Sequence, residues 1–315
     1  MNLRLAPRLA LLLLAAFSTV PLVSAAPKIG VLLKAKSPFW AAAEKGALEA
    51  GEKLGAEVLV RAPLTENDVS VQVQLLNALV AQGIEALVIA PNNKEFLDAP
   101  VTAAAAKGIK IVVIDSALDN PASPVFIGTN QRAAGEAAGE LLARLIAAGD
   151  EVSFLKHNQN SGATSQREAG ALEKLRAAHP NVVVRGDIYS STDKNVEAER
   201  AALVLSKYPK TKGIIASSTA GTLAMLKLME SKNADGSIKF IGFGFNLMPE
   251  VAAGIDSGVM HGWVAQLPGK TAYQGVETAL ALIAGKSVPA TIHTPFMVVT
   301  KDNLKTPEVQ ALLAQ

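Results

Sequence analysis

The chain has 315 residues, of which 50% are hydrophobic, only 4% aromatic and 18% charged. Its 30 basic and 28 acidic residues nearly balance. This argues against a nucleic-acid surface, which needs a basic excess gathered on one face. The absence of cysteine excludes disulfides, thiolate metal sites, a cysteine nucleophile and a lipid anchor on an N-terminal cysteine.

Residues 1–25 have the pattern of a secretory signal peptide. Arg4 and Arg8 precede a short apolar stretch at 9–17, and small residues at 23–26 offer a cleavage site. A membrane anchor is disfavoured, because the stretch is shorter than the roughly 20 residues that span a bilayer. We therefore expect export to the periplasm, cleavage near residue 25, and a mature chain with 28 basic and 28 acidic residues.

After this leader, short apolar runs alternate with segments of helical spacing. The predicted strands are 28–33, 57–61, 86–90 and 110–114, and the predicted helices between them include 41–54 and 69–82. Apolar runs without a polar alternation are typical of parallel strands that are buried on both faces. The first half of the chain therefore predicts a βαβ series.

The pattern begins again near Asp150. The predicted strands are 151–156, 182–188, 213–216 and 239–243, and the predicted helices are 165–177, 194–207 and 219–231. Two such series indicate two α/β domains, each with a Rossmann-like parallel sheet. In open sheets of this class ligands bind beyond the carboxyl ends of the strands, so the residues that follow each strand are the candidate site.

Enzyme signatures are missing from the sequence. It has neither a G-x-G-x-x-G dinucleotide fingerprint nor a G-x-S-x-G nucleophile elbow, and Val264 occupies the position where a phosphate loop ending in PGKT would need its earlier glycine. We expect no catalysis, no metal and no cofactor. Four histidines lack metal-ligand spacing and are expected to be surface or structural residues: His157, His179, His261 and His293.

Several segments along the chain carry a family resemblance. They are KIGVLLKAKSPFWAAAEKGALEAGEKLGAEVLV, VQVQLLNALVAQGIEALVIAPNN, GIKIVVIDS, GTNQRAAGEAAGELL, TSQREAGALEKL and FIGFGFNLMPEVAAGIDSGVMHGWVAQLPGK with its continuation to residue 286. In order and spacing they resemble the type I periplasmic sugar-binding proteins, the soluble receptors of ABC importers, and most of all the ribose- and allose-binding branch.

The resemblance implies two Rossmann-like lobes joined by three crossings, near Gly128, Gln266 and Pro295. The implied lobes are residues 27–128 with 267–294, and residues 129–266 with 295–315. The lobes of such proteins close on a ligand by a hinge motion. The resemblance also implies a monomer with no nucleic-acid partner.

By the same resemblance, the first lobe holds aromatic and polar ligand contacts. Phe39 and Trp40 stand where the family stacks aromatic rings on the C–H face of a sugar. Lys34 matches a lysine that binds sugar oxygens in the arabinose- and allose-binding relatives. Ser37 stands where ribose binders often have asparagine, and Asn93 follows the third strand with an amide.

The carboxylate expected in the first lobe is Asp115, which matches the sugar-binding aspartate of the family. A carboxylate can accept two hydroxyl hydrogen bonds, which its charge strengthens. In the second lobe Arg167 matches an arginine whose planar fork binds neighbouring oxygens. Gln266 and Asn246 match amide or acidic positions of the family, and Ser218 follows a strand of the second sheet.

Departures from the family pattern leave the ligand open. Ser218 and Thr219 stand where relatives have Asn-Asp, and Thr192 stands where an aromatic often covers the sugar. These changes would suit a smaller polyol, a furanose, or a ligand with its own negative charge near Lys34 and Arg167.

The predicted function is that of a periplasmic solute-binding protein that captures a sugar or sugar-like polyol and delivers it to an ABC permease. A first alternative is a sensor subunit whose loaded form is presented to a chemoreceptor or sensor kinase. A sugar-responsive DNA-binding repressor shares the two-lobe fold but needs a helix-turn-helix where the leader stands. An enzyme is the remaining alternative and would turn over a bound sugar.

Overall fold

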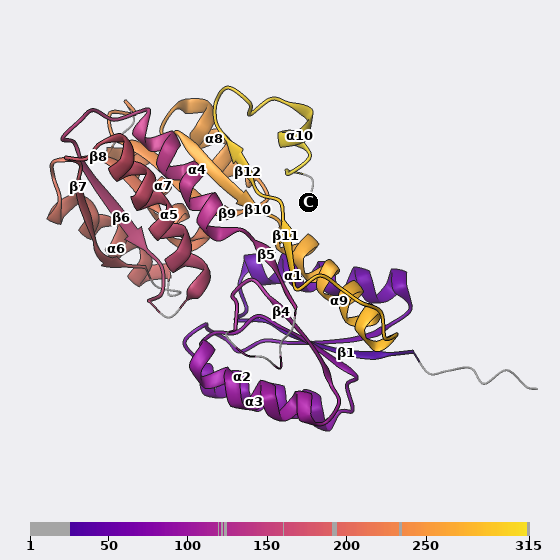
Figure 1. The fold of residues 1–315 in the computed structure, drawn as a ribbon. Helices are drawn as coiled ribbons and strands as arrows, with labels where there is room; N and C mark the ends of the chain where they lie inside the picture. The colour runs from indigo at the N-terminus through magenta and orange to yellow at the C-terminus, as the bar shows by residue number, and fades with distance from the viewer. Residues whose placement is uncertain are drawn as a thin grey trace, which may run out of the picture.

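The computed structural model describes residues 26–118, 120, 122, 125–159, 161–190, 194–232 and 235–313. The predicted signal peptide and Thr192 lie outside these residues. Figure 1 shows two lobes, each built around one sheet and connected by a narrow waist. The expected architecture of two α/β lobes with interleaved helices is confirmed.

The sheet of the first lobe has the strand order β11-β5-β4-β3-β1-β2, and all its pairs are parallel. Its strands are β1 Lys28–Leu32, β2 Glu57–Arg61, β3 Ala86–Ile89, β4 Lys110–Ile114, β5 Phe126–Thr129 and β11 Thr291–Thr294. Its helices are α1 Pro38–Leu54, α2 Val69–Ala81, α3 Lys94–Ala106 and α9 Pro268–Ile283. Every residue of β3 is buried, as expected of a strand that is covered on both faces.

Helices cover both faces of this sheet. Ala43 of α1 and Ala272 of α9 pack on one face together with Val31 and Val88. Leu76 of α2 packs on the other face, where Figure 1 shows α2 and α3 side by side at the bottom of the molecule. The residues that follow β1, β3 and β4 at the carboxyl edge of the sheet include the buried Lys34, Asn92 and Ser116.

The sheet of the second lobe repeats this plan in the order β12-β10-β9-β8-β6-β7. Its strands are β6 Glu151–Lys156, β7 Val183–Tyr189, β8 Thr211–Ala216, β9 Lys239–Phe245, β10 Gly262–Gln266 and β12 Met297–Val299. Its helices are α4 Gln131–Ala143, α5 Gly162–Ala178, α6 Lys194–Lys207, α7 Thr219–Lys232, α8 Pro249–Ser257 and α10 Pro307–Gln310. This sheet is parallel, as expected, except for its edge strand β12, which pairs antiparallel to β10.

The chain passes between the two sheets after β5, after β10 and after β11. Threonines hold these passages together. Thr294 at the end of β11 contacts Thr129 at the end of β5 (Oγ1–Oγ1 3.4 Å), and Thr271 of α9 donates to Thr294 over 3.2 Å. The hinge region is therefore tied by side-chain hydrogen bonds as well as by the backbone.

Helix α5 begins three residues and strand β8 two residues earlier than expected, and other ends differ by one residue. Two further boundaries differ for local reasons that the structure shows. Helix α1 begins at Pro38 instead of residue 41, because Ser37 accepts a hydrogen bond from Trp40 N at the N-cap and proline suits the first helical position. Strand β9 continues past residue 243 to Phe245, since Gly244 and Phe245 pair with β10. Position 244 requires glycine, because a Cβ at this position would overlap the ring of Trp263.

Among the described helices, none combines the length and the apolar character that a membrane-spanning segment needs.

Candidate ligand-binding cleft

A pocket lies where the carboxyl ends of the two sheets meet. It is lined by four of the predicted ligand-binding residues, namely Phe39, Trp40, Asp115 and Gln266. Phe39 and Trp40 come from the first turn of α1, Asp115 follows β4, and Gln266 ends β10 of the other sheet. The structure thus brings residues from both lobes to one pocket at the edge where sheets of this class bind ligands.

Lys34 and Asp115 form a buried ion pair beside this pocket. Their Nζ and Oδ2 atoms lie 2.7 Å apart, with the lysine side chain 3% and the aspartate side chain 13% exposed. Lys34 also donates to Ser116 Oγ over 2.6 Å, and its ammonium lies 5.8 Å from the centre of the Trp40 ring. Ser116 Oγ in turn donates to Asp115 Oδ2 over 3.1 Å, so the ion pair and this hydrogen bond both engage Oδ2 rather than Oδ1.

Asp115 has an equivalent in the second lobe. Both Asp115 (φ 65°) and Asn246 (φ 47°) adopt the left-handed backbone conformation, which aspartate and asparagine tolerate better than other non-glycine residues. Each residue follows the third strand from the edge marked by β11 or β12, so the two sheets present them at matching positions. The pairing of Asn246 N with Gln266 O (3.0 Å) fixes this turn against β10.

Arg167 reaches the site from α5 and is buried. Its Nε and Nη2 atoms both donate to Gln131 Oε1, over 3.1 and 2.6 Å, and Nη1 donates to the carbonyl of Ser217. The guanidinium stacks 4.6 Å from the centre of the Phe243 ring. Burial lowers the pKa of Arg167 to about 10, against the influence of the Asp115 and Glu168 carboxylates, so it stays charged at neutral pH.

Gln266 belongs to the same network as Arg167. Its Oε1 accepts from Gln131 Nε2 over 2.8 Å, and its Nε2 donates to the carbonyl of Gly244 over 3.3 Å. Gln131 therefore links two predicted ligand contacts, yet it escaped sequence analysis. Gln131 directly follows the segment that we predicted to pass between the lobes, but nothing in the sequence indicated that its side chain belongs to the site.

The aromatic side of the cleft is formed by residues of both lobes. Phe39 packs edge-on against Trp40, with ring centres 4.9 Å apart, and against Phe245 of β9, at 5.8 Å. Trp40 is only 4% exposed, whereas Phe39 is partly exposed. Trp40 thus packs in the core of the first lobe and still lines the pocket with one part of its ring.

Three other predicted residues have structural partners outside the pocket lining. Ser37 caps α1, and Asn93 caps α3 by accepting from Glu95 N and Phe96 N over 2.9 and 3.1 Å. Ser218 accepts from Gly221 N over 3.2 Å at the start of α7 and lies 3.4 Å from Ser190 Oγ. A ligand contact stays a prediction for these three residues, as it does for the other predicted site residues.

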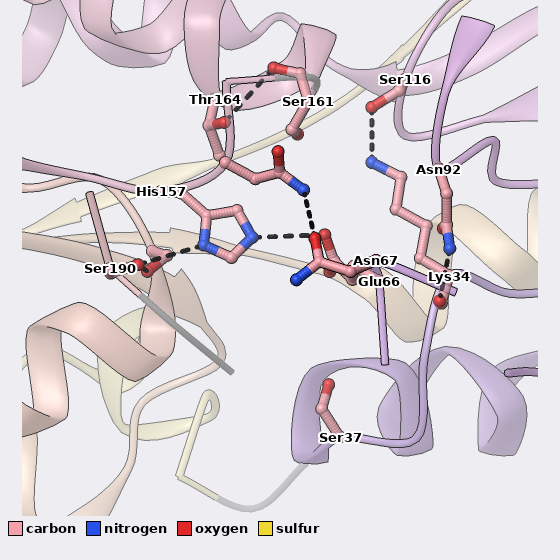
Figure 2. A network of polar contacts seen from close by, with 12 residues as sticks. Lys34, Ser37, Glu66, Asn67, Asn92, Ser116, His157, Ser161, Thr164 and Ser190 are labelled. Carbon is pink, nitrogen blue, oxygen red and sulfur yellow. Dashed lines mark hydrogen bonds and ion pairs between the residues drawn. The ribbon is translucent and has the colours of Figure 1, made fainter. Parts of the chain in front are cut away.

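Two residues that sequence analysis did not select meet across the cleft. Glu66, in the loop after β2, contacts His157, which directly follows β6, with Oε2 and Nε2 3.2 Å apart (Figure 2). His157, which we expected to be a surface or structural residue, thus contacts a residue of the other lobe. Burial acts to raise the pKa of Glu66, but His157, Lys34 and the Trp40 hydrogen bond together lower it to about 2.

The described residues contain no group of three or more His, Cys, Asp and Glu side chains placed to hold a metal ion. The polar groups of the cleft are instead carboxylate, amide, ammonium and guanidinium groups next to aromatic rings. This combination suits a small polar molecule with apolar patches.

Comparisons with known proteins agree with this geometry. Residues 29–287 match the family described as Periplasmic binding protein domain. The D-ribose/D-allose-binding protein of Pseudomonas aeruginosa is 26% identical, over 87% of this chain and 89% of that protein. The D-allose-binding periplasmic protein of Escherichia coli is 28% identical, over 84% and 88%. A carbohydrate transporter solute-binding protein from Agrobacterium radiobacter, solved with D-arabinose, superposes with a TM-score of 0.85 and 29% identity, over 92% of this chain and 99% of that one.

Proposed function

The chain belongs to the periplasmic binding protein domain family, and from this premise we propose that it captures a neutral sugar between its lobes and delivers it to an ABC permease. The observation that carries the choice of a neutral ligand is the buried pair of Lys34 and Asp115. Its ammonium is already neutralised, so it offers little attraction to a ligand with a negative charge of its own.

The second cation of the cleft has partners as well. Arg167 donates to Gln131 and to the Ser217 carbonyl, and it lies within the electrostatic influence of Asp115 and Glu168. The charges near the pocket are thus balanced by the protein itself. The names of the relatives, which bind D-ribose, D-allose and D-arabinose, also support a neutral monosaccharide.

In the proposed complex the sugar makes two kinds of contact, apolar contacts with aromatic rings and hydrogen bonds with polar side chains. The rings of Phe39 and Trp40 face its C–H groups, and Asp115 Oδ1 accepts from its hydroxyls. Gln266 and Arg167 complete the contacts from the second lobe once the cleft closes. No bond is made or broken, and the ligand shifts the protein toward the closed form by the free energy with which it prefers that form.

Three finer statements accompany this proposal. The protein is exported through a leader that ends near residue 25, which the intact mass of the periplasmic form would verify. It acts as a monomer, which light scattering would verify. Presentation of the loaded protein to a chemoreceptor or sensor kinase is a second proposal, and a pull-down against the periplasmic domains of such receptors and against the permease would separate the two roles.

Thermal unfolding of the periplasmic form, freed of co-purified ligand, tests the function. The panel contains D-ribose, D-allose, D-arabinose, polyols such as xylitol, and sugar acids. A ligand at 1,000 times its Kd stabilises the native state by about 4 kcal/mol, which raises Tm by roughly 7 °C in a protein of this size. We expect a neutral monosaccharide to give the largest shift.

Two results would contradict the proposal. If only sugar acids or sugar phosphates raise Tm, Lys34 and Arg167 act as charge partners of the ligand and its proposed neutrality is wrong. If no compound of a broad carbohydrate panel raises Tm, carbohydrate binding itself is wrong, although the fold is unaffected.

A further inference from the structure

A continuous series of polar contacts crosses the cleft beside the pocket. Trp40 Nε1 donates to Glu66 Oε1 over 3.1 Å, and the other carboxylate oxygen, Oε2, lies 3.2 Å from His157 Nε2. His157 Nδ1 lies 3.3 Å from Ser190 Oγ, which in turn lies 3.4 Å from Ser218 Oγ. Figure 2 shows the imidazole of His157 between Glu66 and Ser190.

The chemistry of the groups fixes the direction of the bond between Glu66 and His157. Because the pKa of Glu66 is about 2, its carboxylate is ionised and can only accept, so Nε2 of His157 carries a hydrogen. The contact between Nδ1 and Ser190 Oγ can form in either direction, because a hydroxyl both donates and accepts. Both oxygens of Glu66 are thus occupied by N–H donors, one from the first lobe and one from the second.

A neighbouring contact joins the same two loops. Asn158 Nδ2 donates to Asn67 Oδ1 over 3.4 Å, next in sequence to His157 and Glu66 respectively. The exposed fraction of the side chain is 16% for Glu66 and 12% for His157. Other charged groups face the pair from each lobe: Lys34 acts on Glu66 electrostatically, and Glu168 accepts from His157 N over 3.3 Å.

We propose that Glu66 and His157 are positioning residues that hold the lobes closed over the ligand, with Glu66 also fixing the Trp40 ring against which the ligand packs. This inference rests on the proposed function. Glu66 and His157 belong to different lobes, so opening of the hinge must break their contact. The pair therefore acts on the closed form alone, and it links closure directly to an aromatic residue of the pocket.

The kinetic consequence is selective. During ligand capture the pair forms at the closing step, after the ligand has entered the open cleft, so its loss should leave the association rate nearly unchanged. A hydrogen bond to a charged group that is partly shielded from water contributes enough to slow dissociation by about tenfold. Glu66→Ala and His157→Ala should each raise the dissociation rate of the best-binding sugar of the panel by about this factor.

A double-mutant cycle distinguishes a bridge from two independent effects. Because both single variants break the same contact, Glu66→Ala/His157→Ala should dissociate no faster than Glu66→Ala, which also loses the hydrogen bond from Trp40. Glu66→Gln keeps one acceptor oxygen and should recover part of the effect. The matched control is Glu151→Ala/Arg185→Ala, which removes an ion pair of 3.0 Å within the second sheet and should leave the dissociation rate at the wild-type value.

A second readout needs no sugar. The chain has no cysteine, so Lys107→Cys on the first lobe and Arg200→Cys on the second supply its only two thiols for spin labels. Both positions are exposed. In the sugar-free protein, Glu66→Ala should lower the fraction of molecules at the short interlobe distance about five- to tenfold. The control variant, labelled at the same two positions, should keep the wild-type fraction.

The two measurements separate this inference from the proposed function. If sugars bind and Glu66→Ala leaves both the dissociation rate and the distance distribution unchanged, the bridge is wrong and the function stands. If no sugar binds the wild type, the proposed function is wrong, and the distance distribution alone tests the bridge between Glu66 and His157. A drop in the short-distance fraction then supports the bridge, and identical distributions overturn it.

Discussion

Replacement of Asp115 by asparagine is expected to weaken sugar binding by at least about 100-fold and to lower the free energy of unfolding by about 3 kcal/mol. The substitution keeps the shape of the side chain and suits the left-handed backbone at this position. It removes the charge that strengthens two hydroxyl hydrogen bonds. It also leaves the ammonium of Lys34, which is 3% exposed, without its carboxylate.

Calorimetric titration and chemical unfolding measure the two effects. The matched control is Asp187→Asn, which removes the carboxylate from an ion pair with Lys207 at the surface. Exposed pairs of this kind contribute only about 0–1 kcal/mol, because water and salt screen them. The account of the cleft would be wrong if Asp115→Asn bound sugar like the wild type, or if both variants lost equal stability.

Gly135→Ala should be the most damaging small substitution outside the pocket. Gly135 of α4 faces the turn of α5 that carries Arg167, and a Cβ there would overlap the carbonyl oxygen of Arg167. A Cβ at Gly139 or Gly170 would also overlap a carbonyl oxygen of the opposite helix, though less severely. We expect the helices to be forced apart, with a loss of about 3 kcal/mol of unfolding free energy and at least about tenfold weaker sugar binding, because Arg167 moves with its helix.

Gly162→Ala supplies the control within the same helix. Gly162 is exposed at the start of α5, and a Cβ there has no atom within 4 Å. The change should leave affinity unaltered and stability equal or slightly higher, since alanine favours helix formation. Equal unfolding midpoints for the two variants in urea would contradict the close packing of α4 on α5.

Much of the fold was predictable because its strands and helices follow from local patterns. The strands at 57–61, 110–114 and 151–156 and the helix at 194–207 have the bounds that periodicity indicated. Errors arose where a boundary depends on one hydrogen bond, as at Ser37, or on packing between sheets, as at Gly244 against Trp263. The antiparallel direction of β12 could not be predicted from its own residues, since it depends on how the chain returns to the second lobe after β11.

The site was predictable in part for a related reason. Asp115, Lys34, Arg167 and Gln266 lie at strand ends or on family motifs, and the structure places them in or next to one pocket. Glu66 and His157 could not be paired from sequence, because 91 positions separate them and only the angle between the lobes brings them together. Likewise, Gln131 gains its role from the buried guanidinium beside it rather than from any pattern in its own segment.

The most direct test of the central claim is a crystal structure of the protein with the sugar that gives the largest rise in Tm. We predict electron density for one sugar between the two lobes, with its C–H face on Phe39 and Trp40, hydroxyls on Asp115 Oδ1, and further hydrogen bonds from Gln266 and Arg167. Density for the sugar outside this cleft, or a liganded structure in which Asp115 makes no contact with it, would contradict the proposed site.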